Sequence, residues 1–187
     1  METVTHPSLE ELEAGMEMIR QSPKDHGVLR MIVRRPQEDL REALQEAELL
    51  LTDGLAGDNW KFRGSKSTPD GSANPHAQIT LTNARSIALV AQTEDRWSLA
   101  GDQLYVDLDL GMDNLPPGTR LAIGSAVLEV SAVPHNGCRK FSDRFGVDAM
   151  KFVNSPEGKQ LHLRGINTRI VQAGTIHVGD IVSKLEG

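Results

Sequence analysis

The second half of the chain alternates short, β-branched apolar segments with turn residues, and this pattern most limits the folds available to it. Strand patterns occur over residues 104–110, 120–123, 126–133, 161–163, 168–172, 175–178 and 181–184. Single glycines and Pro116-Pro117-Gly118 separate them, as expected of turns. Many short strands with turns at close intervals are typical of a barrel. We therefore predict a mainly β fold, a β-barrel with a few peripheral α-helices.

The start of the chain has a different pattern and predicts a helical extension. Ser8 and Glu11 have the spacing of a capping box, in which each side chain bonds the other's backbone. The apolar residues that follow on one helical face are Leu9, Leu12, Met16 and Ile19. Pro23 ends this pattern. We divide the chain into an N-terminal helical extension, residues 1–27, and a barrel domain, residues 28–187.

The region between the extension and the repeated strands predicts further elements. A β-branched run predicts a strand over residues 28–33, and residues 78–81 predict another. Leucines and alanines at helical spacing predict a helix over residues 39–51. Asn83 has the character of an N-cap for a short helix. Residues 63–75 form a Gly/Ser/Pro/Asn-rich loop, and two interpretations stay open: a functional loop or a disordered surface insertion.

Composition excludes several classes of protein. The 187 residues carry a net charge of −6, which argues against a nucleic-acid surface because phosphate binding depends on Lys and Arg. No apolar run approaches the roughly 18 residues of a membrane helix, and the N-terminus lacks a signal peptide pattern. A single cysteine allows no intramolecular disulfide. We expect a cytoplasmic protein without nucleic-acid or membrane partners.

That single cysteine, Cys138, lies in a charged segment bounded by glycines, residues 134–146. Its sequence neighbours include His135, Asn136, Arg139, Lys140 and Arg144. Nearby cations stabilise a thiolate, which is the nucleophilic form of cysteine and a ligand for soft metals. The alternative interpretation is a small buried apolar residue, which is the usual role of a free cysteine. A Cys-His pairing of Cys138 with His135 or His162, as in hydrolases, is a further alternative.

A second basic segment follows at residues 164–169, with Arg164 and Arg169 at its ends. If the two segments meet at one barrel mouth, several guanidinium groups surround the Cys138 thiol. Such a pocket suits a phosphorylated or otherwise anionic ligand, because guanidinium binds phosphate in a bidentate way. The alternative is a ring of ordinary surface arginines.

Several short motifs, taken in order, resemble the MOSC domain, the module named from the C-terminus of molybdenum cofactor sulfurases. They are the Gly-x-x-Gly-Asp element at residues 54–58, Leu-Ala-Gly-Asp at 99–102, and residues 107–110, 114–118, 123–130, 134–146, 164–165 and 174–182. The likeness covers most of residues 28–185. One departure is Asn59-Trp60, where some small relatives have histidine.

This resemblance implies a MOSC-type barrel that binds the molybdenum cofactor, a molybdopterin carrying a metal and a terminal phosphate. Cys138 would then ligate molybdenum as the catalytic residue, or carry sulfur towards it. The residues that the resemblance and the charge pattern assign to cofactor binding are Arg139, Lys140, Arg144, Arg164, Asp58, His135 and Asn136. Pyridoxal phosphate is not expected, because 187 residues leave no room for the desulfurase of the larger sulfurases.

Three functions follow from these observations. The first is an enzyme that reduces N-hydroxylated or other N-oxygenated compounds at a Cys138-ligated molybdenum, served by a redox partner. The second is a non-catalytic sulfur or cofactor carrier with Cys138 as persulfide site, loaded by a sulfur-donor protein. The third is a metal-free structural domain in which Cys138 is only a core residue.

Overall fold

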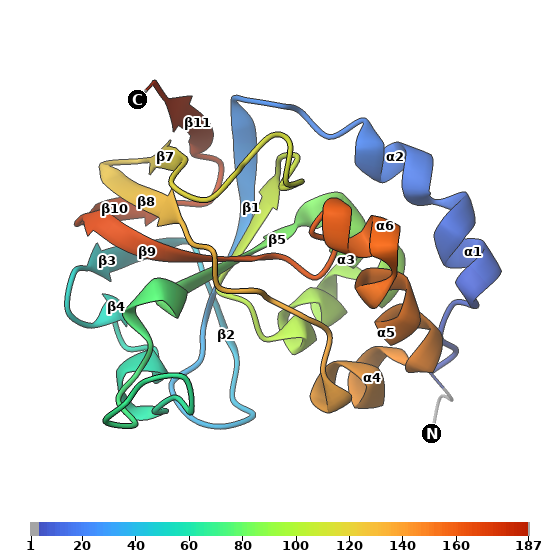
Figure 1. Ribbon diagram of the computed structural model, residues 1–187, viewed down its shortest axis with the longest axis horizontal. Helices are drawn as coiled ribbons and strands as arrows, with labels where there is room; N and C mark the ends of the chain where they lie inside the picture. The colour runs from blue at the N-terminus through green and yellow to red at the C-terminus, as the bar shows by residue number, and fades with distance from the viewer. Residues whose placement is uncertain (1–3, 187) are drawn as a thin grey trace.

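Seven strands close into a mixed β-barrel in the computed structural model, which describes residues 4–186 (Figure 1). They are β1 Gly27–Arg34, β5 Ile79–Asn83, β6 Leu104–Asp107, β7 Arg120–Ile123, β8 Ala126–Val130, β9 Ile166–Gln172 and β11 Ile181–Leu185. The order is β11-β7-β8-β9-β5-β6-β1, and β1 pairs again with β11 to close the sheet. Only β5 and β6 run parallel. The predicted barrel is confirmed.

Four further strands lie outside the closed barrel. Strand β2 (Glu42–Leu44) pairs with β1, and β3 (Glu46–Leu50) lies between β10 (Gly174–His177) and β4 (Gly54–Leu55). The predicted helix over residues 39–51 is therefore wrong. Within β3 burial alternates, with Ala47 and Leu49 inside and glutamates outside, which is the strand period of two. Pairing with the distant β10 outweighs the local helical spacing.

The helices gather on one side of the barrel, the right side of Figure 1. They are α1 Leu9–Ala14, α2 Met16–Arg20, α3 Ala84–Ala91, α4 Arg139–Phe145, α5 Val147–Asn154 and α6 Pro156–Gln160. The 3₁₀ turns, which do not all lie on this side, are η1 Trp60–Phe62, η2 Pro75–Ala77 and η3 Glu94–Ala100. The Asn83 cap of α3 is confirmed, since its side chain accepts bonds from two backbone amides. The predicted strand over residues 161–163 is wrong, because these residues form a turn.

Two separate hydrophobic cores account for this arrangement. One fills the barrel, and the other lies between its outer wall and the helices. The Ser8–Glu11 capping box is present, and Leu12, Met16 and Ile19 are buried in the second core. The N-terminal helices therefore dock outside the barrel, as predicted. The proposed domain boundary at residues 27 and 28 stays a prediction. No helix within residues 4–186 is long and apolar enough to span a bilayer.

Candidate functional site

A cavity of about 670 Å³ opens where the β1–β2 loop, the loop after η1, the end of η3 and the Cys138 segment meet. Cationic side chains outnumber anionic ones in its lining. The cations are Arg35, Arg41, Arg63, Lys140, Arg144 and Arg164, and the anions are Glu38 and Asp39. The cavity is therefore basic although the whole chain has a net charge of −6.

The backbone at the end of η3 organises the floor of this cavity. Arg35 donates from Nη1 to the carbonyl of Gly101 at 2.9 Å, and Arg164 donates from Nη2 to the carbonyl of Ala100 at 2.8 Å. Two arginines from distant parts of the chain, one after β1 and one before β9, thus hold consecutive carbonyl groups. Their charges are brought close together at one turn of backbone.

Two more guanidinium groups lie over the same turn. Gly101 has a left-handed backbone (φ +86°), and a Cβ atom there would lie 3.7 Å from Arg41 Nη2 and 3.8 Å from Arg144 Nη1. Burial, and then the charges of Arg144 and Arg35, lower the pKa of Arg41. The cause is direct: like charges and poor solvation both disfavour the guanidinium cation. Asp39 opposes this shift only in part, and no carboxylate in the described residues forms an ion pair with Arg41.

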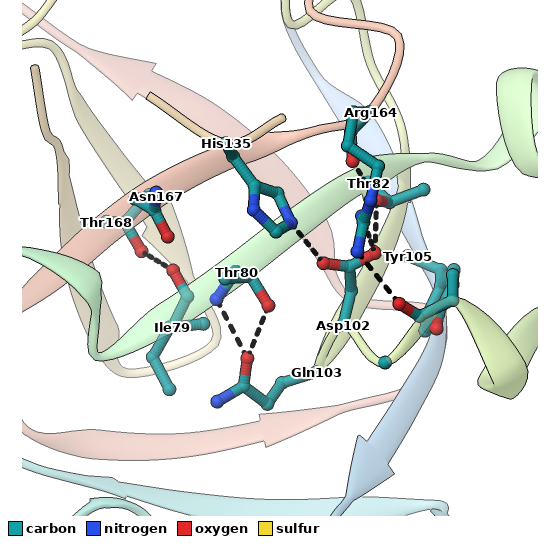
Figure 2. Close-up of polar contacts among 12 residues, drawn as sticks. Ile79, Thr80, Thr82, Asp102, Gln103, Tyr105, His135, Arg164, Asn167 and Thr168 are labelled. Carbon is teal, nitrogen blue, oxygen red and sulfur yellow. Dashed lines mark hydrogen bonds and ion pairs between the residues drawn. The ribbon is translucent and has the colours of Figure 1, made fainter. Parts of the chain in front are cut away.

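A buried ion pair fixes Arg164 beneath the cavity (Figure 2). Its Nη1 lies 2.6 Å from Oδ2 of Asp102, whose side chain is fully buried. Thr82 Oγ1 donates to the same oxygen at 2.7 Å, and His135 Nε2 lies 2.7 Å from the other oxygen. Burial opposes ionisation of Asp102, but Arg164 and His135 outweigh it and hold its pKa well below the usual range.

His135 is held by this pair in one protonation state. Burial and the charge of Arg164 lower its pKa, and Asp102 opposes them only in part. The ring is therefore neutral at pH 7. Because an ionised Asp102 only accepts hydrogen bonds, Nε2 of His135 must be the donor. The lone pair is left on Nδ1.

A second buried pair fixes Arg35 in the same way. Arg35 binds Asp58 through Nε at 2.9 Å and Nη2 at 2.7 Å, and the backbone amides of Arg35 and Trp60 also donate to this carboxylate. The Asp58 side chain is fully buried and does not line the cavity. Asp58 thus orients Arg35 instead of facing a ligand. We call Arg35–Asp58 and Arg164–Asp102 the floor pairs.

The mouth of the cavity has two ion pairs of a different kind. Lys140 Nζ lies 2.7 Å from Glu38 Oε1, and Arg144 Nη2 lies 2.8 Å from Asp39 Oδ1. Both carboxylates are on the β1–β2 loop and both cations are on α4. The side chains of Glu38 and Asp39 are 78% and 68% exposed. We call these the rim pairs.

Cys138 is exposed on the cavity wall, directly before α4. The residue before it is clamped: Gly137 donates to Asn154 Oδ1 at 2.9 Å and accepts from Asn154 Nδ2 at 3.0 Å. In α4, Phe141 lies under the Arg164 guanidinium at 5.0 Å from the ring centroid. These contacts fix the backbone on both sides of Cys138, which lines the same cavity as Arg164. The interpretation of Cys138 as a buried core residue is wrong.

The sequence-predicted residues fall into two groups. Those that line the cavity are Cys138, His135, Asn136, Lys140, Arg144 and Arg164. The others lie elsewhere: Asp58 behind Arg35, Arg139 with a 94% exposed side chain facing Asp143, and Arg169 paired with Glu129. Sequence reasoning missed Arg35, Arg41 and Arg63. The only signal in the sequence was for Arg35, which belongs to the pair of arginines directly after the predicted strand at residues 28–33.

Buried polar atoms without a hydrogen-bond partner are concentrated in residues that line the cavity. Four buried side-chain polar atoms in the described residues have no hydrogen-bond partner, and three belong to cavity residues: Arg41 Nε, Arg164 Nε and Asn59 Oδ1. Buried polar atoms are rarely left unpaired. Two donors and one acceptor suit a ligand with an anionic group and a polar ring. No three His, Cys, Asp or Glu side chains within residues 4–186 are grouped to hold a bare metal ion.

A protein-family model, the MOSC domain, matches residues 38–183, and the chain belongs to the MOSC domain family. Solved structures share its fold. YuaD from Bacillus subtilis is 14% identical over 86% of this chain and 97% of that chain, with a TM-score of 0.64. YiiM from Escherichia coli is 15% identical over 86% and 70%, with a TM-score of 0.56. YiiM from Geobacillus stearothermophilus is 15% identical over 87% and 74%, with a TM-score of 0.52. No curated protein matches the chain.

Proposed function

We propose that this chain binds the molybdenum cofactor in the cavity and reduces N-hydroxylated or other N-oxygenated compounds there, with Cys138 as the metal ligand. One observation carries the proposal. The only thiol of the chain is exposed on the wall of a cavity in which cations outnumber anions and burial and neighbouring arginines disfavour the charge of Arg41. A soft donor beside anion-binding cations is the combination that a metal-bearing pterin phosphate requires.

The residues of the cavity fit the group. Arg41 and Arg144, which meet over Gly101, would hold the phosphate, because a guanidinium offers parallel donors to phosphate oxygens. Arg164 Nε and Asn59 Oδ1 would bond the polar edge of a ring. Cys138 would supply a thiolate ligand, since thiolate binds soft metals. Asp58 and Asp102 take no part in contact and position Arg35 and Arg164.

Reduction of an N-hydroxyl compound consumes two electrons and two protons and releases water, and the electrons would come from a redox partner protein. When bound, the cofactor supplies the two-electron chemistry. His135 is the proton-handling residue in this proposal. Because Nε2 is fixed on Asp102, the neutral ring would take up each proton from solvent at Nδ1 and pass it to the bound compound. Arg164 keeps Asp102 ionised and so preserves this tautomer.

One observation favours a second candidate function, a sulfur carrier. The exposed position of Cys138 leaves the thiol accessible to another protein. A sulfur-donor protein could transfer a sulfur atom from its own persulfide to Cys138, leaving a thiol on the donor and a persulfide here. This alternative uses the same cavity to present sulfur to the cofactor.

Metal and pterin content test the proposal without measuring activity. The protein is produced in a host that makes the cofactor and is analysed for molybdenum by mass spectrometry and for pterin by fluorescence. Wild type and the control Ser142→Ala, one turn along α4 and outside the cavity lining, should carry both. Cys138→Ser should fold and lose molybdenum, because oxygen is a harder and less acidic donor. Wild type without molybdenum, pterin or transferable sulfur would overturn both functions.

A further inference from the structure

We propose that Glu38 and Asp39 compete with the ligand for Lys140 and Arg144 and so make the cavity selective for ligands with at least two negative charges. The inference rests on the proposed function only in that the cavity binds an anion. It assigns a specificity role to two residues of the β1–β2 loop, and it concerns the charge of the ligand.

In the rim pairs, the two carboxylates that a ligand would displace are already bound to the cations. Lys140 and Arg144 of α4 each hold one carboxylate of the loop, at 2.7 Å for Lys140 and 2.8 Å for Arg144. The same two cations line the cavity. A carboxylate and a phosphate oxygen are equivalent acceptors for a guanidinium or an ammonium group. The loop therefore occupies the positions that ligand oxygens would take.

The carboxylates of Glu38 and Asp39 can be displaced from their cations at little cost. Water surrounds both, and exposed ion pairs gain little over hydration. Arg35 is fixed by its floor pair at one end of the loop. Between that anchor and β2, residues 37–40 are all exposed. Asp39 also has a left-handed backbone (φ +60°), which is uncommon for a residue other than glycine. Nothing else described around Glu38 or Asp39 bonds their carboxylates.

Charge selectivity follows from the number of carboxylates. When both carboxylates are in place, the charges of Lys140 and Arg144 are neutralised. A singly charged ligand can then replace only one of the two carboxylates. A phosphate or pyrophosphate group carries two or more charges and several oxygens, so it can replace both at once. Arg41, which has no carboxylate of its own, adds attraction for the incoming anion. Abundant monoanions are thereby kept out of the cavity.

Calorimetric titration of the full chain with inorganic pyrophosphate and with formate tests the proposed selectivity for multiply charged anions. The test variant is the double substitution Glu38→Gln and Asp39→Asn. The control is Glu42→Gln, which removes a carboxylate from an arginine ion pair on β2, outside the cavity lining. We expect the double variant to bind pyrophosphate about tenfold more tightly, as two exposed pairs allow, and to gain measurable formate binding. The control should match wild type within about twofold.

Hydrogen exchange separates competition from a simple loss of negative charge. In wild type, pyrophosphate should raise backbone exchange of residues 37–41, because the loop is released. In the double variant this exchange should already be high without ligand. If pyrophosphate binds wild type but exchange in the loop stays equal or falls, the competition is disproved and anion binding stands. If neither protein binds pyrophosphate, this proposal and the anion-binding cavity of the proposed function fail together.

Discussion

The floor pairs and the rim pairs use the same chemistry, an arginine or lysine beside a carboxylate, at opposite extremes of burial. In the floor pairs the arginine side chains are 8% exposed and the carboxylates fully buried. In the rim pairs the carboxylates are 78% and 68% exposed. A buried charge cannot lose its partner without a large cost, whereas an exposed one returns to water. The comparison therefore separates ion pairs that position the site from ion pairs that a ligand can exchange.

The largest expected effect is on stability, and it comes from breaking one of the floor pairs. Asp102→Asn removes the counter-charge of Arg164 and leaves a buried cation unpaired. We expect a loss of about 3–5 kcal/mol in the free energy of unfolding, measured by urea denaturation. The matched rim substitution, Asp39→Asn, should cost no more than about 1 kcal/mol. Equal losses for the two variants would mean that burial does not distinguish floor from rim.

The next effect concerns Arg41, which belongs to neither set of pairs. Arg41→Gln should weaken pyrophosphate binding by about 1.5–3 kcal/mol, the value of a charged hydrogen bond. Because burial and its neighbours Arg144 and Arg35 already disfavour its charge, stability should stay equal or rise. Calorimetry and thermal unfolding measure the two quantities, with Arg120→Gln on β7 as an exposed control. A variant that loses stability and keeps pyrophosphate affinity would show that Arg41 is structural.

A smaller effect is expected from pH. The pKa of His135 is lowered in the folded state, so as pH falls below about 6.5 the unfolded chain binds a proton at this residue first. Stability should therefore fall from that pH down to the folded pKa, with a slope of at most about 1.4 kcal/mol per pH unit. The stability curve of His135→Gln should lack this component between pH 7.5 and 5. Parallel curves for the two proteins would contradict the assignment.

Local rules in the sequence predicted local structure well. The capping box of Ser8 and Glu11 and the Asn83 N-cap are both confirmed. A helix cap can be predicted from sequence because it involves only residues within one turn. The strand at residues 46–50 was missed for the opposite reason. Its helical spacing is real, but its pairing partner lies more than 120 residues away in β10, and spacing within a segment carries no information about that partner.

The candidate site divides in the same way. Lys140 and Arg144 were predicted because they neighbour Cys138 in the chain. Arg35 and Arg41 reach the cavity from a loop about a hundred residues earlier, and only the barrel closure brings them there. Arg139 is the opposite case: it directly follows Cys138 in the sequence, but the turn of α4 directs its side chain to solvent. Neighbours of Cys138 in the sequence identified the two cations of the rim, and the tertiary fold supplied Arg35, Arg41 and the carboxylates of the rim.

The most direct test of the account is whether the thiol and the anion site share one cavity. Cys138 is the only cysteine, so its alkylation by iodoacetamide reports on this position alone. Pyrophosphate should slow alkylation of wild type with the same concentration dependence that calorimetry gives for binding. Arg41→Gln should need correspondingly more pyrophosphate for the same protection. Pyrophosphate that binds the protein and leaves the alkylation rate unchanged would place the anion away from Cys138 and contradict the account.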